Sequence, residues 1–141
     1  MITDMRTMRS GVAAGADLTI PPSRSVDGFE VLRPVGVIDS SSVRILRQRL
    51  AELPSPCRAV LDLEAVSFID SAGLGAIIGG LRHIRDVGGD LELAAPRSSI
   101  SRVFAATGID RITQVHPSVE EAVAAYRLSG VVAVGTSLAG A

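Results

Sequence analysis

The chain has 141 residues, of which 47% are hydrophobic, and its formal net charge is −1 at pH 7. This length suits one globular domain of about 100 to 120 residues with unstructured ends. Acidic and basic side chains are scattered along the sequence rather than gathered in blocks. The sequence therefore shows no cluster of basic residues of the kind that binds nucleic acid or an anionic membrane. A protein partner or a small molecule is favoured instead.

The two ends of the chain lack the pattern of a folded element. Residues 1–16 have no hydrophobic period and are expected to be disordered, and residues 129–141 are expected to form a flexible tail, which leaves a folded domain over 17–128. No apolar run approaches the roughly 20 residues that span a bilayer, and the N-terminus lacks the apolar core of a signal peptide. We therefore expect a cytoplasmic protein without a membrane anchor.

The first predicted elements are two strands joined as a hairpin. One strand is expected over Leu18 to Ser23, where two prolines confine it to an edge or shorten it. The other is expected over Phe29 to Val37, and Asp27-Gly28 between them is a hairpin turn signal.

A helix and a strand–turn–helix unit follow. Asp39 and serines 40 to 42 supply N-cap chemistry for a helix that Pro54 ends. Ala59 to Leu63 is an almost continuous apolar run, as in a buried parallel strand, and the apolar stretch extends to Ile69. The next helix is predicted from an apolar stripe, and Gly88-Gly89 closes it. Its stripe consists of Leu74, Ile77, Ile78, Leu81 and Ile84.

The last third of the chain alternates short strands and helices. Strands are expected over Asp90 to Ala95 and Ile112 to Val115, with a helix between them that starts at Ser98 or Ser99 and stops at Gly108. A capping box from Ser118 to Glu121 opens the final helix. The order of elements predicts an α/β fold with a mixed, largely parallel sheet of about five strands and about four helices mainly on one face.

Ser71 places a hydroxyl at the mouth of a predicted helix. Unpaired backbone N–H groups and the helix dipole favour an anion such as a phosphate at that position. The simpler interpretation is that Ser71 caps the helix, a role worth about 1 kcal/mol. Asp70 could already be the cap, however, and Asp39 could lie at the same sheet edge, which would give two carboxylates beside one hydroxyl.

Four glycines in the same helix, at positions 73, 75, 79 and 80, each cost about 1 kcal/mol relative to alanine. Close packing on the sheet and a docking surface for a partner both explain them. Their spacing does not match a dinucleotide fingerprint, and the P-loop lysine is absent, so no nucleotide cofactor is expected.

Catalytic and metal sites are not supported by the pattern. A nucleophile elbow needs glycine two residues before the serine, and here that residue is Ile69. His83 and His116 have no acidic partner at suggestive spacing, and His83 is expected on a solvated helix face. Cys57 has no Cys or His at metal-ligand spacing and is expected to be a small, at least half-buried hydrophobe, with a redox input as the open alternative. We expect no enzyme, no metal and no cofactor.

Four motifs in the order of the chain resemble those of anti-sigma factor antagonists, which belong to the sulfate transporter and anti-sigma factor antagonist (STAS) domain family. The resemblance covers roughly Leu18 to Leu128 and implies the STAS fold. Val37 and Ile38 depart from the Glu and Leu frequent in that family. The motifs are Gly36-Val37-Ile38-Asp39, Asp70-Ser71-Ala72-Gly73-Leu74-Gly75, Gly88-Gly89-Asp90-Leu91-Glu92-Leu93 and Val103-Phe104-Ala105-Ala106-Thr107-Gly108-Ile109.

The resemblance implies a partner-switching regulator in a bacterial cytoplasm. Such an antagonist binds an anti-sigma factor of the serine kinase type and frees the sigma factor, phosphorylation of the serine breaks the complex, and a serine phosphatase restores it. Carried over, Ser71 is the phosphoacceptor and Asp39 is an edge carboxylate able to position its hydroxyl. The partner-binding residues are Asp39, Asp70, Ser71, Ala72, Gly73, Leu74 and Gly75.

Two other functions stay open at this point. A STAS domain can act as a scaffold or a ligand sensor whose serine is never modified, and a small nucleotide-using enzyme could be built around the glycine-rich helix. The oligomeric state and the identity of the sigma factor are not predicted.

Overall fold

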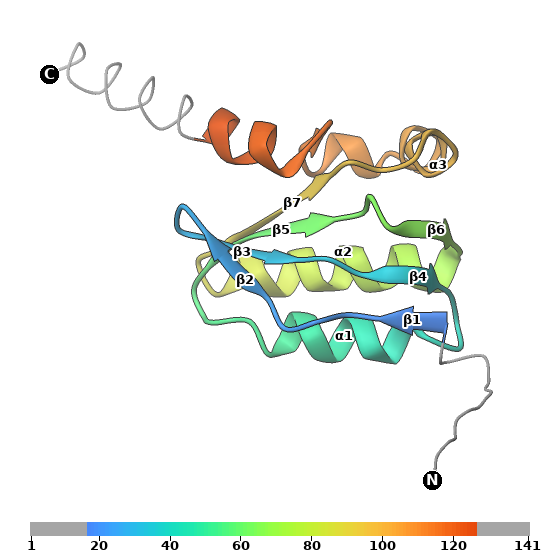
Figure 1. The fold of residues 1–141 in the computed structure, drawn as a ribbon, viewed down its shortest axis with the longest axis horizontal. Coiled ribbons are helices and arrows are strands. Elements are labelled where there is room, and N and C mark those ends of the chain that lie inside the picture. Colours follow the sequence, from blue (N-terminus) through green and yellow to red (C-terminus); the bar gives the residue numbers. More distant parts are fainter. Residues whose placement is uncertain (1–16, 127–141) are drawn as a thin grey trace, which may run out of the picture.

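The computed structural model describes residues 17–126, and within them it has eight strands and four α-helices (Figure 1). The strands are β1 Leu18–Thr19, β2 Arg24–Val26, β3 Phe29–Leu32, β4 Val35–Ile38, β5 Arg58–Asp62, β6 Val66–Ile69, β7 Asp90–Ala94 and β8 Val115–His116. The helices are α1 Val43–Ala51, α2 Ser71–Asp86, α3 Ser98–Thr107 and residues 119–126, with a short 3₁₀ turn at Ile109–Arg111.

The strands form two sheets, of orders β2-β3-β5-β7-β8 and β1-β4-β6. The β2-β3 and β1-β4 pairs are antiparallel, and the β3-β5, β5-β7, β7-β8 and β4-β6 pairs are parallel. The predicted α/β class with a mixed, largely parallel arrangement is therefore confirmed, but the strands divide between two sheets instead of one.

The strands divide between two sheets because two of the predicted apolar segments each contain two strands instead of one. The strand predicted over residues 29–37 is interrupted at Arg33 and Pro34, and its halves β3 and β4 enter different sheets. Proline cannot donate a ladder hydrogen bond, which suits a break at that point. Likewise the apolar stretch that ends at Ile69 contains two strands, β5 and β6, separated by a turn at residues 63–65.

The predicted turn at Asp27-Gly28 is confirmed, but the strand that enters it is β2 and not the strand expected over Leu18 to Ser23. Only Leu18–Thr19 of that segment is a strand, and it pairs with β4 in the other sheet. Asp27 and Gly28 have φ angles of 51° and 87°, the left-handed conformation that a type I′ turn requires at both central positions. Val26 and Phe29 on either side are paired in antiparallel register.

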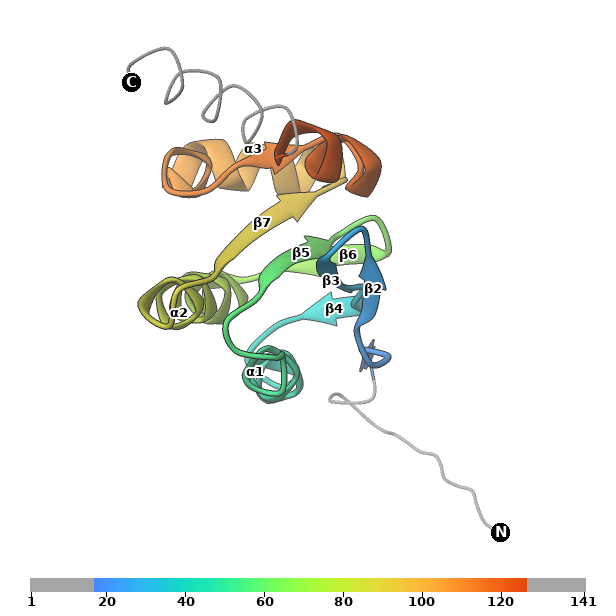
Figure 2. The same ribbon diagram turned by 90° about the vertical axis from the view of Figure 1, so that its left-hand side faces the viewer.

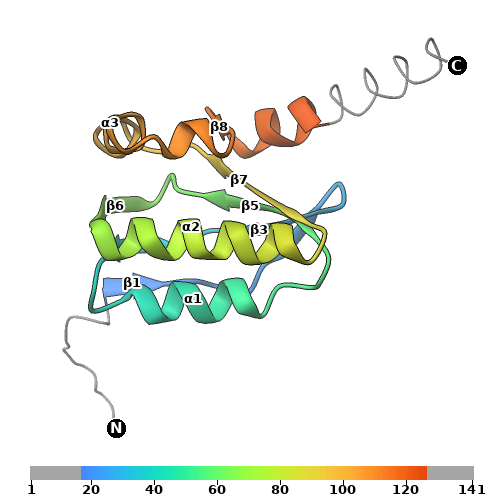
Figure 3. The ribbon, with the colours of Figure 1, turned by 180° about the vertical axis from the view of Figure 1, so that it is seen from behind.

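Helices cover both faces of the five-stranded sheet. Successive side chains of β5 point to opposite faces of the sheet. Leu61 packs in the main core cluster with Ile77 and Leu81 of α2. Val60, on the other face, packs with Phe29 and Val123. Figure 3 shows α1 and α2 side by side on one face, and Figure 2 shows the helix of residues 119–126 on the other side of the sheet. The final helix is thus the exception to the expected one-sided cover.

Some boundaries differ from the expectation. The last strand lies at Val115–His116 rather than over Ile112 to Val115, because the 3₁₀ turn comes first and Thr113 is buried with its hydroxyl donating to the Leu91 carbonyl at 2.6 Å. The expectations for residues 1–16 and 129–141 lie outside the described residues, so the boundaries of the domain remain a prediction. Between residues 17 and 126, no helix is long and apolar enough to cross a membrane.

Candidate functional site

The parallel strands β4 and β6 bring two acidic loops to one edge of the three-stranded sheet. Ile38 and Ile69 are partners in the register, and each is the last residue of its strand. Asp39 and Asp70 are the next residues along the chain, so both carboxylates leave the sheet at the same edge. The Asp70 N–H donates to the Ile38 carbonyl at 3.1 Å, which extends the pairing by one step.

Asp70 is the N-cap of α2. Its Oδ1 accepts a hydrogen bond from the Gly73 N–H at 3.0 Å, and its backbone is extended, as an N-cap requires. Its other oxygen, Oδ2, accepts from the Ser40 N–H at 3.1 Å. Both carboxylate oxygens of Asp70 therefore hold backbone groups, one in its own helix and one in the loop before α1.

Ser71 is the first residue of α2 and is exposed to solvent. Its hydroxyl makes no hydrogen bond with any residue of the part that the structure describes. The capping interpretation of Ser71 is therefore wrong, because Asp70 fills that role. In the first turn of a helix the N–H groups of Ser71 and Ala72 have no intrahelical acceptor, so an added anion at this position would meet unpaired donors and the positive end of the helix dipole.

Asp39 closes its own turn. Its Oδ1 accepts from the Ser41 hydroxyl at 2.7 Å, from the Ser41 N–H at 3.0 Å and from the Ser42 N–H and hydroxyl, each at 3.2 Å. These hydrogen bonds, led by the Ser41 hydroxyl, lower the pKa of Asp39 below its ordinary value. Among the described residues no hydrogen bond joins Asp39 to Ser71, so Asp39 adds negative charge at this edge without holding the hydroxyl.

The glycines of α2 fall into two classes. A Cβ on Gly73 would lie 2.8 Å from both the carbonyl oxygen and Cγ2 of Ile38, and a Cβ on Gly80 would lie 2.6 Å from Leu50 Cδ1. These two allow close packing against β4 and α1. Gly75 and Gly79 are exposed, and a Cβ there would meet nothing within 4 Å, so packing does not explain them.

The remaining predicted partner residues differ in exposure. Gly75 is open, whereas Ala72 and Leu74 are half-buried against the main core. Sequence reasoning missed Phe68, which is 53% exposed although it lies inside an apolar stretch. It is paired with Val37 across β4 and β6, two residues before Asp70. A period-two pattern within residues 66–69 alone was too short to reveal it.

One histidine does have an acidic partner. His116 Nε2 lies 2.8 Å from Glu92 Oε1, which corrects the expectation that neither histidine has one; the parallel pairing of β7 with β8 brings the residues together across 24 positions. This pair lies in the five-stranded sheet, whereas Ser71 follows β6 of the other sheet. His83 is exposed, as expected.

Cys57 is half-buried and packs against the main core. Burial, and secondly the negative charge of Glu30, raise the pKa of its thiol. The packing interpretation therefore accounts for Cys57 better than a reactive thiolate does.

Comparisons with known proteins give a consistent result. The sequence model of the STAS domain family matches residues 21–122. An anti-sigma factor antagonist of Bordetella bronchiseptica, BtrV, is 32% identical over 104 residues, which cover 72% of this chain and 90% of that protein. Two Thermotoga proteins, from T. neapolitana and T. maritima, are 35% and 36% identical, but the matches span only 58% and 59% of their lengths, less than two thirds.

The fold has close solved counterparts. The crystal structure of an anti-sigma factor antagonist from Mycobacterium paratuberculosis superposes with a TM-score of 0.70 at 27% identity, covering 82% of this chain and 99% of that one.

Proposed function

The chain belongs to the STAS domain family, and we propose that it is an anti-sigma factor antagonist that binds an anti-sigma factor of the serine kinase type and is released from it by phosphorylation of Ser71. In this proposal the unphosphorylated protein frees a sigma factor in the cytoplasm, and a serine phosphatase reverses the modification. The protein itself catalyses no reaction. The names of its relatives support the first part of this proposal, and the geometry at Ser71 supports the switch.

The observation that carries the proposal is the exposed, unbonded hydroxyl of Ser71 beside a cap that another residue supplies. A kinase needs an accessible hydroxyl. Because Asp70 holds the helix end, transfer of a phosphate to Ser71 breaks no hydrogen bond between the described residues, and the fold is expected to survive it.

The charge of a phosphate explains why binding rather than folding would change. A phosphoserine adds about −1.5 to −2 charges, at an edge that already carries Asp39 and Asp70. The helix terminus offsets part of this charge locally. A docked partner would have to bury the remainder, and a loss of only about 3 kcal/mol of binding free energy lowers affinity more than a hundredfold.

The test is to incubate the purified protein with ATP, magnesium and each serine-kinase anti-sigma factor of the source organism, and to locate added phosphate by mass spectrometry. We expect one kinase to bind the protein and to modify Ser71. Ser71→Ala should bind that kinase and accept no phosphate, and Ser71→Glu should bind at least about tenfold more weakly with an unchanged melting temperature.

Two results would contradict the proposal. Binding without phosphate on Ser71 would favour a scaffold or ligand-sensing role, and equal affinities of wild type and Ser71→Glu would show that charge at this position does not control the complex.

A further inference from the structure

An open groove runs between α1 and α2 on the side of the helices away from the sheet. Its volume is about 340 Å³. Leu50 and Ala51 of α1 and Gly75, Gly79 and Gly80 of α2 line it, together with the exposed side chains of Arg47 and His83. The groove begins at Gly75, one helical turn beyond Ser71 on the same face of α2.

The lining favours a protein segment over a small molecule. Small-molecule sites carry a few polar groups that converge on the ligand and orient it. Here the floor is apolar, and the polar groups are long side chains at the edge. The bare backbone of Gly75 and Gly79 lets another chain approach α2 closely, which is the geometry of a helix laid into a groove.

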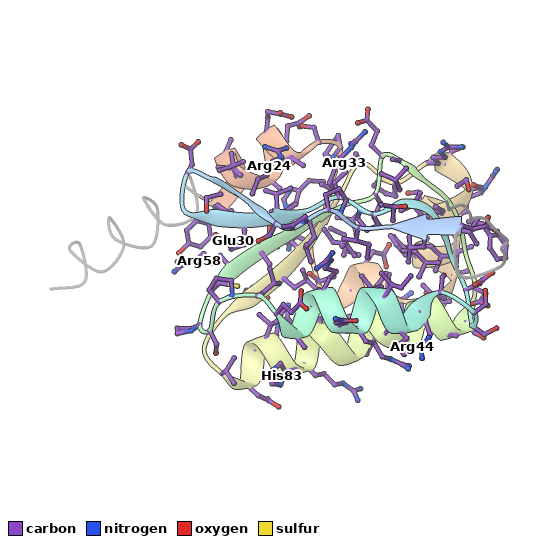
Figure 4. The ribbon with its side chains drawn as sticks, turned by 60° about the horizontal axis from the view of Figure 1, so that its bottom comes forward. Arg24, Glu30, Arg33, Arg44, Arg58 and His83 are labelled. Carbon is purple, nitrogen blue, oxygen red and sulfur yellow. The ribbon has the colours of Figure 1, made fainter. Side chains whose placement is uncertain are left out.

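The charges around the groove select an acidic segment. Arg47 and His83 are exposed at the rim, and Arg44 and Arg82 lie two helical turns from Ala51 and Gly75 on the same faces. None of these four side chains has a hydrogen-bond or ion-pair partner among residues 17–126. Figure 4 labels Arg44 on α1 and His83 on α2, both on the helical layer.

The acidic residues of the same two helices do not neutralise this rim. Glu52 and Asp86 lie at the C-terminal ends of α1 and α2, and Glu52 is bonded to Arg49 at 2.9 Å. Among the described residues, Arg47 at the groove therefore has no counter-ion, and neither do Arg44 and Arg82, which lie on the two helices beyond the lining. A complementary partner would be negatively charged.

We propose that the groove between α1 and α2 receives an acidic amphipathic helix of the anti-sigma factor. The inference rests on the proposed function, since it names the chemistry of the same partner. It also gives the switch a direction: a phosphate on Ser71, one turn from the mouth of the groove, repels the acidic helix that the arginines attract. Attraction and repulsion then act on one docked element.

The experiment measures the dissociation constant of the complex with the kinase that binds the wild-type protein, by titration calorimetry at low and at physiological salt. Gly79→Leu fills the groove while its Cβ meets nothing in the fold, and Arg47→Glu reverses one rim charge. We expect Gly79→Leu to weaken binding at least about tenfold, and Arg47→Glu to weaken it and to reduce its salt dependence. Both should keep the wild-type melting temperature or exceed it.

Matched controls lie on α3, away from the groove. Ala106→Leu likewise introduces a leucine, and Arg102→Glu likewise reverses one charge, at exposed positions of that helix. Both should leave the dissociation constant within about twofold of wild type.

The outcomes separate the two proposals. Wild-type affinity in both groove variants would overturn the inference and leave the proposed function standing. A Gly79→Leu change that converts a dimer to a monomer without altering affinity for the kinase would make the groove a contact between copies of this chain, which also overturns it. Failure of every kinase to bind the wild type would overturn both.

Discussion

Asp70 Oδ2 accepts a hydrogen bond from the Ser40 N–H at 3.1 Å, while Asp70 Oδ1 caps α2 through the Gly73 N–H. One carboxylate therefore fixes the start of α2 relative to the loop that leads into α1. The two helices that enclose the groove are joined at this point, next to Ser71.

This relationship predicts that Asp70 stabilises the fold and Ser71 does not. Asp70→Ala should lower the free energy of unfolding by about 1–2 kcal/mol, since a helix cap is lost and the Ser40 N–H loses its acceptor. That loss corresponds to a fall in melting temperature of roughly 4–8 °C per kcal/mol for a domain of this size. Ser71→Ala should change the free energy by less than about 0.5 kcal/mol. A thermal melt that ranks the two variants in the opposite order would contradict the assignment of the cap.

The glycines of α2 should respond to alanine with opposite signs. Gly79→Ala is expected to stabilise by about 0.5–1 kcal/mol, because the new methyl group meets open space and the helix loses a glycine. Gly73→Ala is expected to destabilise by about 1–3 kcal/mol, because its Cβ would lie 2.8 Å from the Ile38 carbonyl oxygen, which belongs to the backbone. Urea denaturation measures both. Stabilisation by both substitutions would mean that α2 can move away from β4 at little cost.

Arg33 should matter to stability because of Asp62. Arg33 Nη1 lies 3.0 Å from Asp62 Oδ2, and the Asp62 side chain is only 8% exposed. Arg33→Ala leaves that carboxylate without its charged partner, and we expect a loss of about 1–3 kcal/mol. In the double variant with Asp62→Ala the loss should be smaller than the sum of the two single losses.

Arg85 provides the control for Arg33. It is equally exposed, at 43% against 42%, and it pairs with the exposed Asp90 at 2.9 Å. Arg85→Ala should cost between 0 and about 1 kcal/mol. An equal cost for the two arginines would show that burial of Asp62 plays no part.

Cys57 should react slowly with alkylating agents. Burial and the charge of Glu30 raise its pKa, so at pH 7 to 8 the thiolate fraction is smaller than in an unfolded chain. The rate of iodoacetamide labelling as a function of pH should have its midpoint above the usual value of about 8.5. Glu30→Gln should lower that midpoint in part, because burial is the larger cause. A midpoint below 8 in the native protein would instead revive a redox role.

Much of this fold could be predicted from local patterns because single residue types dictate the outcome. Asp27-Gly28 gave the hairpin, and the apolar stripe of residues 74–84 gave α2. The division into two sheets could not be predicted, since β3 and β4 are separated by only two residues, as are β5 and β6 by only three, and only pairing between distant segments shows that the members of each pair enter different sheets.

The candidate site was predicted in part for the same reason. The sequence placed Asp39, Asp70 and Ser71 after consecutive apolar runs, and the register of β4 with β6 brings their loops together. The cap by Asp70 could be predicted from its place before the helix. The second hydrogen bond of Asp70, to the Ser40 N–H, and the glycines of α2 that face open space depend on contacts that no spacing along the chain encodes.

If Ser71 is phosphorylated as proposed, the fact that Asp70 and not Ser71 caps α2 has a consequence for the lifetime of the protein in a cell. Cellular proteases and chaperones act on the unfolded fraction, so a modification that changes stability by 1–2 kcal/mol alters abundance several-fold. A hydroxyl that takes no part in holding its helix can gain and lose a phosphate while the unfolded fraction stays the same. The number of molecules would then stay constant through many cycles of modification, and only the share available to a partner would vary.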